Sequence, residues 1–358
     1  MRILIDIGHP GHVHLFRPFA KEMMSRGHKV LFTCREKEFE KELLNAEGFL
    51  YVSFGKKHKS ILGKMFGLLK FDFLELKTAL KFKPDIFLSH GSPYAAHAAF
   101  FLRKPHISFE DTFNFEQIRF YKPFTDSILT STYNHPYIGK NNLHYSGYHE
   151  LAYLHPAVFT PDSGVIKELG LNTDEKYVII RLVSWSATHD LGHKGISYQN
   201  KILAVETISQ YAKVFISSEN PLPAELEKYK FPLKPDRMHH AISFACLLYG
   251  ESATMATEAA VLGVPSIYID NTSRFYTKDI QNKYQIIFNF SESDTDQKLS
   301  IERAIELINT PKENWAQRRR RILNDNINVT EFLIWFIEKY PESRSVLRNN
   351  PSYEIRFK

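Results

Sequence analysis

The chain has 358 residues, of which 43% are hydrophobic and 24% are charged, and its formal net charge is +6. This length exceeds what one hydrophobic core usually supports, so two domains of a soluble globular protein are expected. No run of about 18 or more apolar residues occurs, which excludes a membrane-spanning helix. The basic balance favours anionic partners: nucleotides, nucleic acid or an acidic membrane face.

Two features of the sequence indicate the cytoplasm. Met1 leads directly into a hydrophobic stretch, which leaves no room for a signal peptide. Cys34 and Cys246 show neither metal-binding nor redox spacing. We therefore expect a cytoplasmic protein in a reducing compartment.

Strands and helices alternate through the first half of the chain. Strands are predicted at residues 2–7, 29–33, 49–53, 85–89, 106–109, 127–130 and 143–145, with helices at 15–26, 36–45 and 94–102. This alternation predicts a parallel, doubly wound sheet.

The loop after the first strand reads Gly8-His9-Pro10-Gly11-His12-Val13-His14. Its glycines let the backbone approach a ligand, and its histidines follow the carboxyl end of a strand. We expect His12 to act as an acid or base; substrate contacts are expected from Gly8, His9, Gly11, His14 and Arg17. Helix capping and packing are the alternative for the histidines, and a solvated side chain is the alternative for Arg17. No metal is expected, because no Cys, Asp or Glu with ligand spacing lies nearby.

Two further segments of the chain are strongly basic. Residues 56–83 mix lysines with apolar residues, as in a basic amphipathic helix that lies on an anionic membrane. A helix that packs on the sheet with solvated lysines is the alternative. Residues 318–321 are four arginines on a predicted helix, and a solvated face is favoured over nucleic acid because aromatic residues are not interleaved.

Glu110 and Asp111 follow the predicted strand at 106–109. Adjacent carboxylates at the carboxyl end of a strand are candidates for general acid–base catalysis, with helix capping by Asp111 or Thr112 as the alternative. His149 and His155 lack the spacing of a zinc protease motif, which needs the second histidine four residues after the first.

The second half repeats the alternation, with strands at 177–182, 214–217, 245–248, 265–269 and 286–288. Residues 147–162, with Pro156 and Pro161, form the expected connection. We predict two Rossmann-like domains, 1–160 and 161–330, that face each other across a ligand cleft. The last segment, 331–358, is a helix and tail expected to pack back on the first domain.

The loop at 183–197 is long and unusually rich in functional side chains. Loops of this kind seldom serve connection alone. A base or sugar can stack on Trp185, and Lys194 or His193 can supply positive charge to a diphosphate. The substrate-binding residues predicted here are Ser184, Trp185, His189, His193 and Lys194.

Residues 249–270 read as a strand end, a turn of small residues at 250–253, a helix at 254–262 and the next strand. Such a turn directs unpaired N–H groups and the positive end of the helix dipole at an anion, most often a phosphate. Glu258 follows Thr254 by four residues and shares its side of the helix, so it can take the hydroxyls of a ribose. The alternative is an ordinary βαβ unit with Ser252 or Thr254 as the N-cap.

The segments 8–18, 181–195 and 250–265 resemble the GT-B superfamily of nucleotide-sugar glycosyltransferases and UDP-N-acetylglucosamine 2-epimerases, and more closely a family of unknown function within it. The resemblance implies a uridine diphosphate sugar on the second domain, with Glu258 at the ribose. The implied diphosphate contacts are Ser252, Ala253, Thr254 and Met255. Residues 106–111 resemble the epimerase strand end that carries a catalytic carboxylate. Related turns carry glycines where this chain has Glu251-Ser252-Ala253, and a carboxylate beside a diphosphate is repulsive unless it points away.

The predicted function is a metal-independent glycosyltransferase of glycan or polysaccharide synthesis that uses a UDP-sugar and no further cofactor. The expected acceptor is a glycan or a lipid-linked molecule, and no nucleic acid is expected as a partner. Residues 56–83 are expected to make peripheral contact with the inner membrane face. One alternative is a UDP-N-acetylhexosamine 2-epimerase. The other is a non-enzymatic protein that binds a nucleotide sugar or a polyanion.

Overall fold

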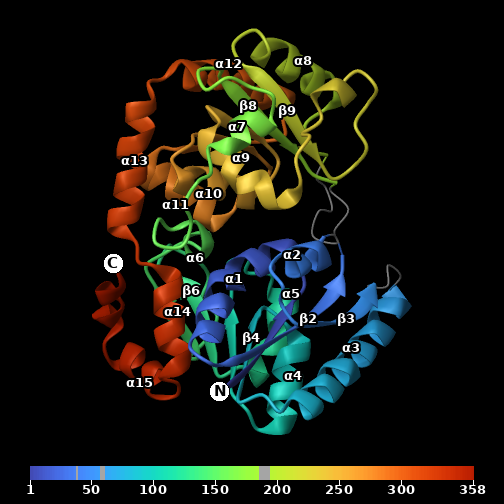
Figure 1. The fold of residues 1–358 in the computed structure, drawn as a ribbon, viewed down its shortest axis with the longest axis vertical. Helices are drawn as coiled ribbons and strands as arrows, with labels where there is room; N and C mark the ends of the chain where they lie inside the picture. Colours follow the sequence, from blue (N-terminus) through green and yellow to red (C-terminus); the bar gives the residue numbers. More distant parts are fainter. Residues whose placement is uncertain (38, 57–60, 185–193) are drawn as a thin grey trace. The chain divides into compact units, whose positions relative to one another are not determined.

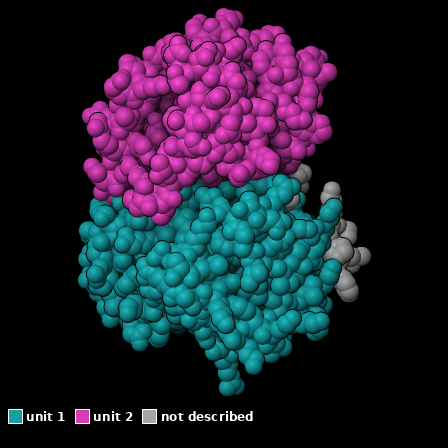
Figure 2. All heavy atoms as spheres, viewed as in Figure 1, with its two compact units in different colours: residues 1–153, 326–358 teal, residues 154–325 magenta. Residues whose placement is uncertain are grey.

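The computed structural model describes residues 1–37, 39–56, 61–184 and 194–358, with side chains described from residue 67 onward in the helix that begins at Ile61. The chain forms two compact units (Figures 1 and 2). Unit 1 comprises residues 1–153 and 326–358, and unit 2 comprises residues 154–325. The sequence places the corresponding boundaries at 160 and 330.

Unit 1 contains a seven-stranded parallel sheet in the order β3-β2-β1-β4-β5-β6-β7. Ile3, Leu4 and Ile5 of the interior strand β1 are all fully buried. Since successive side chains of a strand point to opposite faces, both faces of the sheet are covered. The strands are β1 (Arg2–Ile7), β2 (Lys29–Glu36), β3 (Tyr51–Lys56), β4 (Ile86–His90), β5 (His106–Phe109), β6 (Ser127–Ser131) and β7 (Asn142–Tyr145). The helices are α1 (Pro10–Ser25), α2 (Glu40–Ala46), α3 (Ile61–Phe82), α4 (Pro93–Leu102), α5 (Phe115–Tyr121), α14 (Val329–Glu338) and α15 (Glu342–Asn349).

The C-terminal segment belongs to unit 1, where α14 packs against α1. The ring of Phe332 stacks on Tyr145 of β7 with 5.6 Å between ring centroids. The Glu354 carboxylate accepts the N–H and the hydroxyl of Ser146 at 2.5 and 2.6 Å. The two ends of the chain therefore share one hydrophobic core. Between the units, the chain passes through α6 (Leu151–Leu154).

Unit 2 contains a five-stranded parallel sheet in the order β12-β11-β10-β8-β9. The strands are β8 (Tyr177–Leu182), β9 (Lys213–Ser218), β10 (Leu247–Gly250), β11 (Ser266–Ile269) and β12 (Ile287–Phe290). The helices are α7 (Gly164–Glu168), α8 (Tyr198–Ile208), α9 (Met238–Phe244), α10 (Ala253–Leu262), α11 (Phe275–Tyr284), α12 (Asp294–Asn309) and α13 (Lys312–Asp325).

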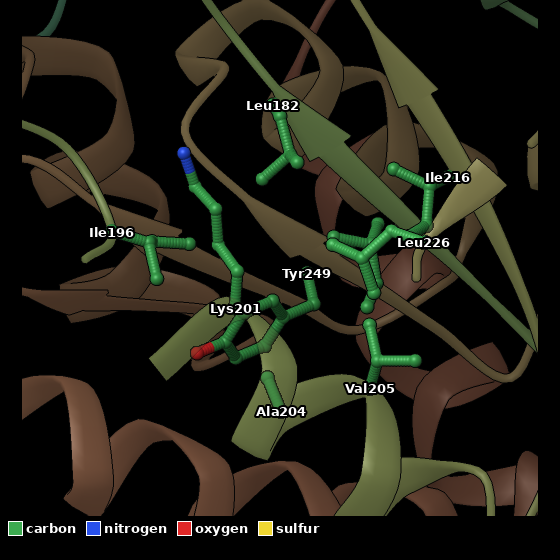
Figure 3. Close-up of a pocket in the computed structure, with 9 residues that line it drawn as sticks. Leu182, Ile196, Lys201, Ala204, Val205, Ile216, Leu226 and Tyr249 are labelled. Carbon is green, nitrogen blue, oxygen red and sulfur yellow. The ribbon is translucent and has the colours of Figure 1, made fainter. Parts of the chain in front are cut away.

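A small cavity lies inside unit 2, lined by apolar side chains that include Leu182, Ile196, Val205 and Ile216 (Figure 3). Its volume is about 10 Å³. That is room for one water at most, so this cavity is a packing defect of the core and cannot hold a nucleotide.

The predicted α/β fold of two parallel sheets is confirmed, but some predicted element boundaries are wrong. The strand predicted at 245–248 is β10, Leu247–Gly250, because the unpredicted helix α9 extends to Phe244. The helix predicted at 36–45 begins at Glu40, since β2 continues through Glu36 to pair with β3.

Candidate functional site

The order of the strands identifies one switch point in each sheet. In unit 1 the order reverses between β1 and β4, and in unit 2 it reverses between β8 and β10. Ligands of open α/β sheets bind beside the carboxyl ends of the strands at such points. The loops that follow these strands begin at Gly8, Gly91, Val183 and Glu251, so three of the four lie in segments that the sequence predicts as functional.

In unit 2, the start of α10 lies directly beyond β10. Ser252 is the N-cap, and its hydroxyl accepts the N–H of Met255 at 3.3 Å. Gly263, at a φ of 86°, ends the helix. The N–H groups of Ala253 and Thr254 have no partner within the helix, because the first turn of a helix has no preceding carbonyls. Together with the helix dipole, these two groups can bind an anion.

Gly250 brings β10 unusually close to β8. Its φ is 147°, and a Cβ built there would lie 2.0 Å from the carbonyl oxygen of Arg181. No other residue fits this position without a shift of the backbone. The turn before α10 is thereby held against the end of β8.

The carboxylate of Glu251 points to the loop that follows β8. It accepts the N–H of Val183 at 2.8 Å and that of Ile196 at 2.6 Å, and the side chain is buried. These two residues are the two ends of the loop that the sequence predicts to border the nucleotide. Glu251 therefore clamps the described ends of the loop, and each of its oxygens accepts one of the two N–H groups.

Other carboxylates hold the rest of the described loop. Glu219 accepts the N–H of Ser184 at 3.0 Å, and Glu292 accepts the N–H of Lys194 at 2.7 Å. The side chain of Lys194 is exposed. The predicted residues Trp185, His189 and His193 lie outside the described residues.

Glu258 has a buried partner that the sequence does not predict. Its carboxylate lies 2.9 Å from Nε2 of His239 in α9, and both side chains are only 5% exposed. Thr254, one turn earlier, is partly exposed. A ribose would therefore have to share Glu258 with His239, and the ribose contact stays a prediction.

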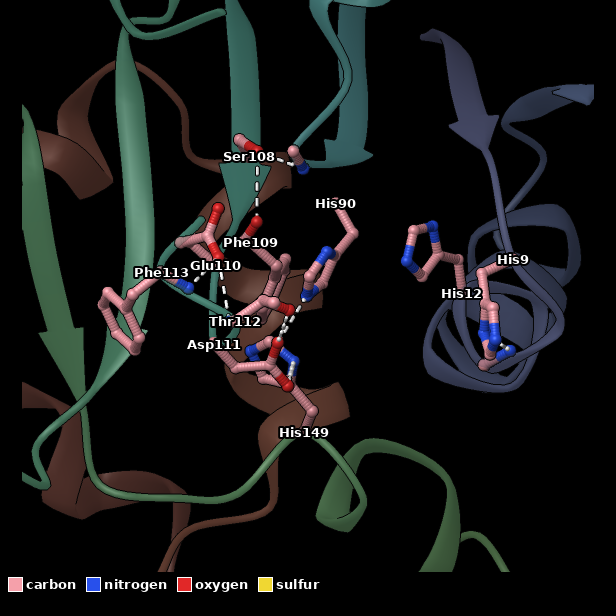
Figure 4. A network of polar contacts seen from close by, with 12 residues as sticks. His9, His12, His90, Ser108, Phe109, Glu110, Asp111, Thr112, Phe113 and His149 are labelled. Atoms are coloured by element: carbon pink, nitrogen blue, oxygen red, sulfur yellow. Dashed lines mark hydrogen bonds and ion pairs between the residues drawn. The ribbon is translucent and has the colours of Figure 1, made fainter. Parts of the chain in front are cut away.

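In unit 1, Asp111 lies between two histidines at the carboxyl ends of the strands (Figure 4). His90, the last residue of β4, places Nε2 3.1 Å from Oδ1, and His149, just after β7, places Nδ1 3.0 Å from Oδ2. The ring of His12 stacks on that of His90, with 4.5 Å between centroids. We call His12, His90, Asp111 and His149 the histidine cluster.

The charges of the histidine cluster follow from burial and from its ion pairs. Burial disfavours the Asp111 carboxylate, but His149 and His90 outweigh burial and hold its pKa well below the ordinary value. Burial also works against charge on His90, and the attraction of Asp111 outweighs it and raises the His90 pKa. Burial, with repulsion from His90 and His9, lowers the pKa of His12 well below its ordinary value. A neutral His12 therefore lies beside an ion pair.

The tautomer of His12 bears on its predicted role as a base. The N–H of Gly8 donates to Nδ1 of His12 at 3.3 Å, which leaves the proton of the neutral ring on Nε2. His12 thus offers a donor, whereas a base needs a free lone pair. His9 is the N-cap of α1 and accepts the N–H of Gly11 at 3.0 Å, which is the capping role.

Glu110 has a structural role in the loop after β5. Its Oε1 accepts the N–H groups of Thr112 and Phe113 at 2.9 and 2.8 Å, and its Oε2 accepts the hydroxyl of Tyr121 at 2.5 Å. Because Glu110 is buried whereas the side chain of Asp111 is 19% exposed, Asp111 is the better acid–base candidate of the adjacent pair.

Two predicted binding residues of α1 face other partners. His14 is buried, and its ring stacks on Tyr153 at 5.6 Å. Arg17 forms an ion pair with Glu47 at 3.1 Å. Neither residue belongs to the histidine cluster.

Within the described residues, His90, Asp111 and His149 are also the one group spaced to hold a metal ion, with ligand atoms within 4.8 Å of one another. Imidazole and carboxylate are ligands of several divalent metals. Here the same atoms contact each other. The expectation that the protein binds no metal stays a prediction. His90 and His149 are the functional candidates that the sequence missed, although His90 directly follows the strand predicted at 85–89.

Solved structures with the same two-domain GT-B architecture cover nearly the whole chain. MnaA from S. aureus, in a co-structure with UDP, has a TM-score of 0.67 at 14% identity, over 96% of this chain and 97% of that one. UDP-GlcNAc 2-epimerase from Neisseria meningitidis, bound to UDP-GlcNAc, has a TM-score of 0.63 at 14% identity, over 95% and 100%. MurG from Acinetobacter baumannii has a TM-score of 0.59 at 14% identity, over 94% and 99%.

The GT-B fold expected from the sequence is thus confirmed. No curated protein is detectably similar in sequence. The chain belongs to the family described as "Protein of unknown function (DUF354)", whose model matches residues 1–330. The predicted membership of a family of unknown function is confirmed as well.

Proposed function

We propose that the protein is a glycosyltransferase that takes a sugar from a UDP-sugar and passes it to an acceptor hydroxyl. The observation that carries this proposal is the orientation of Glu251. Its carboxylate accepts the N–H groups of Val183 and Ile196, and these two donors weaken its repulsion of an anion at the start of α10. In the sequence, Glu251 was the residue that argued most against a nucleotide; in the structure it holds the neighbouring loop.

The diphosphate is assigned to the first turn of α10. The N–H groups of Ala253 and Thr254 would donate to phosphate oxygens, with the cation of Lys194 as a further contact. As the glycosidic bond to the diphosphate breaks, its electron pair stays on the departing UDP. The same donors would stabilise that developing charge, which is how positioned dipoles accelerate such a step.

Asp111 is the proposed base that receives the proton of the acceptor hydroxyl. The acceptor oxygen forms its new bond to the anomeric carbon as it gives up this proton. His90 and His149 hold the two oxygens of Asp111 in place. The lowered pKa of Asp111 makes it a weak base, so the proton transfer must accompany formation of the new bond.

A UDP-N-acetylhexosamine 2-epimerase is the second candidate, and the His90–Asp111 pair favours it. Epimerisation removes a proton from one face of a carbon and returns one to the other face, which needs a base and an acid together. Asp111, with a lowered pKa, can serve as the base, and His90, with a raised pKa, as the acid. Nε2 of His90 lies 3.1 Å from Oδ1 of Asp111. The UDP ligands of the two related structures above agree with either reaction.

A test of the nucleotide site uses Thr254→Asp. A carboxylate in the first turn of a helix interacts favourably with the dipole, by about 0.3–1 kcal/mol, so the fold should be kept or slightly stabilised. The same charge would repel a diphosphate. We expect calorimetry to show UDP binding by the wild type and none by this variant. Gln199→Asp, at the equivalent exposed position of α8, is the matched control and should bind UDP normally. Wild-type protein that does not bind UDP would exclude both candidate reactions.

A second test separates the two candidates. The protein is incubated with UDP-N-acetylglucosamine alone and followed by NMR. An altered sugar, or UDP released by elimination, identifies the epimerase. Turnover that starts only when a glycan or lipid extract is added identifies the transferase.

A further inference from the structure

The most exposed positions among the described residues of α3 carry only apolar and lysine side chains. Leu69, Phe73 and Leu80 are each more than half exposed. They lie four and seven residues apart and therefore form one stripe along the helix. The other exposed residues of this side are Lys70, Lys77 and Lys81.

This apolar surface continues on two neighbouring helices. Phe100 and Phe101 at the end of α4, and Phe120 in α5, are also more than half exposed. Helix α4 packs beside α3 and α5, and α3 and α4 lie side by side in Figure 1. His97 of α4 connects the three helices. Its Nδ1 lies 3.0 Å from the Asp72 carboxylate of α3, and its Nε2 lies 3.0 Å from the carbonyl oxygen of Phe120 in α5. We call this surface the lysine–aromatic face; it consists of Leu69, Lys70, Phe73, Lys77, Leu80, Lys81, Phe100, Phe101 and Phe120.

A basic pocket of about 440 Å³ opens beside α5. Arg119, Lys122 and Lys140 contribute cations to its lining, and Asn141 and Asn142 contribute amides. No carboxylate lines the pocket. Its chemistry fits a phosphate group, which needs several donors and positive charge.

We propose that the lysine–aromatic face docks on an anionic phospholipid bilayer, with the basic pocket against a lipid phosphate. Aromatic and aliphatic side chains on such a face enter the headgroup region, while lysines attract anionic lipids. The core of a protein interface is depleted in lysine, whereas here lysines alternate with apolar residues along α3. No helix within the described residues is long and apolar enough to cross a membrane, so the attachment is peripheral. The proposal does not depend on sugar transfer.

The test is sedimentation of the full chain with large unilamellar vesicles. Wild-type protein should bind vesicles of phosphatidylglycerol and phosphatidylcholine and should not bind phosphatidylcholine alone. Each lysine near an anionic surface contributes about fivefold to partitioning, so Lys77→Gln with Lys81→Gln should weaken binding about 30-fold. Phe73→Ser with Phe101→Ser should weaken it at least about tenfold, because two rings no longer enter the bilayer.

Matched control variants change exposed residues of unit 2. Lys228→Gln with Lys234→Gln makes the same change in net charge, and Leu203→Ser with Tyr211→Ser removes comparable exposed apolar side chains. All of these proteins should keep the wild-type vesicle affinity. Circular dichroism and thermal unfolding confirm that each variant folds.

Three results would overturn docking of the lysine–aromatic face on a bilayer, and a fourth would overturn the lipid phosphate in the basic pocket. The first is wild-type protein that does not bind the anionic vesicles. The second is equal loss of binding in the unit 2 variants, which would mean a general charge effect. The third is a wild-type dimer that the variants of the lysine–aromatic face convert to a monomer, which would make this face an interface between copies. Inorganic phosphate should displace the protein no better than chloride of equal ionic strength; specific displacement would make the pocket a site for a free anion.

Discussion

The clamp formed by Glu251 predicts a specific response to Glu251→Gln. The wild-type carboxylate accepts two backbone N–H groups, those of Val183 and Ile196. The amide keeps one oxygen, so one hydrogen bond is lost and an NH2 group faces a donor. A hydrogen bond to a charged group contributes about 1.5–3 kcal/mol. With the unpaired donors included, we expect the ends of the loop to lose about 2–4 kcal/mol of stability.

Hydrogen–deuterium exchange measures this loss at the two amides themselves. If they exchange by local opening, a loss of 2–4 kcal/mol accelerates their exchange about 30- to 1,000-fold. Because the loop borders the proposed nucleotide site, UDP should also bind more weakly in calorimetry. Glu206→Gln, at an exposed position of α8, is the control and should change neither measurement.

Unchanged exchange at Val183 and Ile196 in Glu251→Gln would refute the clamp. Faster exchange with unchanged UDP affinity would keep the clamp and refute its link to the nucleotide.

Three further predictions follow from buried groups. Gly250→Ala should lower the free energy of unfolding by about 3 kcal/mol or more, because its Cβ would meet the Arg181 carbonyl at 2.0 Å. Gly170 also has a positive φ but has open space around it, so Gly170→Ala should lower the free energy of unfolding by only about 1 kcal/mol. Urea titration measures both variants. Burial lowers the pKa of His106 to about 3. The unfolded histidine binds a proton below about pH 6.5, so the free energy of unfolding should fall as pH decreases, by about 2.5 kcal/mol between pH 7 and 4.5. His106→Gln should reduce this dependence when the free energy of unfolding is measured against pH. Asp111→Asn should reduce turnover at least about 100-fold while UDP still binds, and a variant with wild-type turnover would remove Asp111 as the base.

Local patterns were enough to predict much of the fold. Alternating apolar strands and helices predict parallel sheets because buried parallel strands are continuously apolar. The end of α10 was also readable, since Gly263 is a local capping signal. Boundaries failed where pairing with a neighbour decided them, as at Glu36, where pairing with β3 prolongs β2.

The candidate site was predicted less completely. Asp111 was found because two adjacent carboxylates at a strand end are visible in the sequence. His149 was missed because it lies 38 residues further along the chain and has no local motif. His239 was missed because α9 itself was not predicted.

The sequence alone determined most of the elements and the loops that hold chemistry, because these depend on residues close together in the chain. Only the tertiary structure decided the strand order, and with it the two switch points that select among those loops. It also decided that Glu251 points to Val183 and Ile196 and that His90 and His149 flank Asp111. The direction of a buried carboxylate is set by the donors that packing places around it, and those donors come from distant parts of the chain.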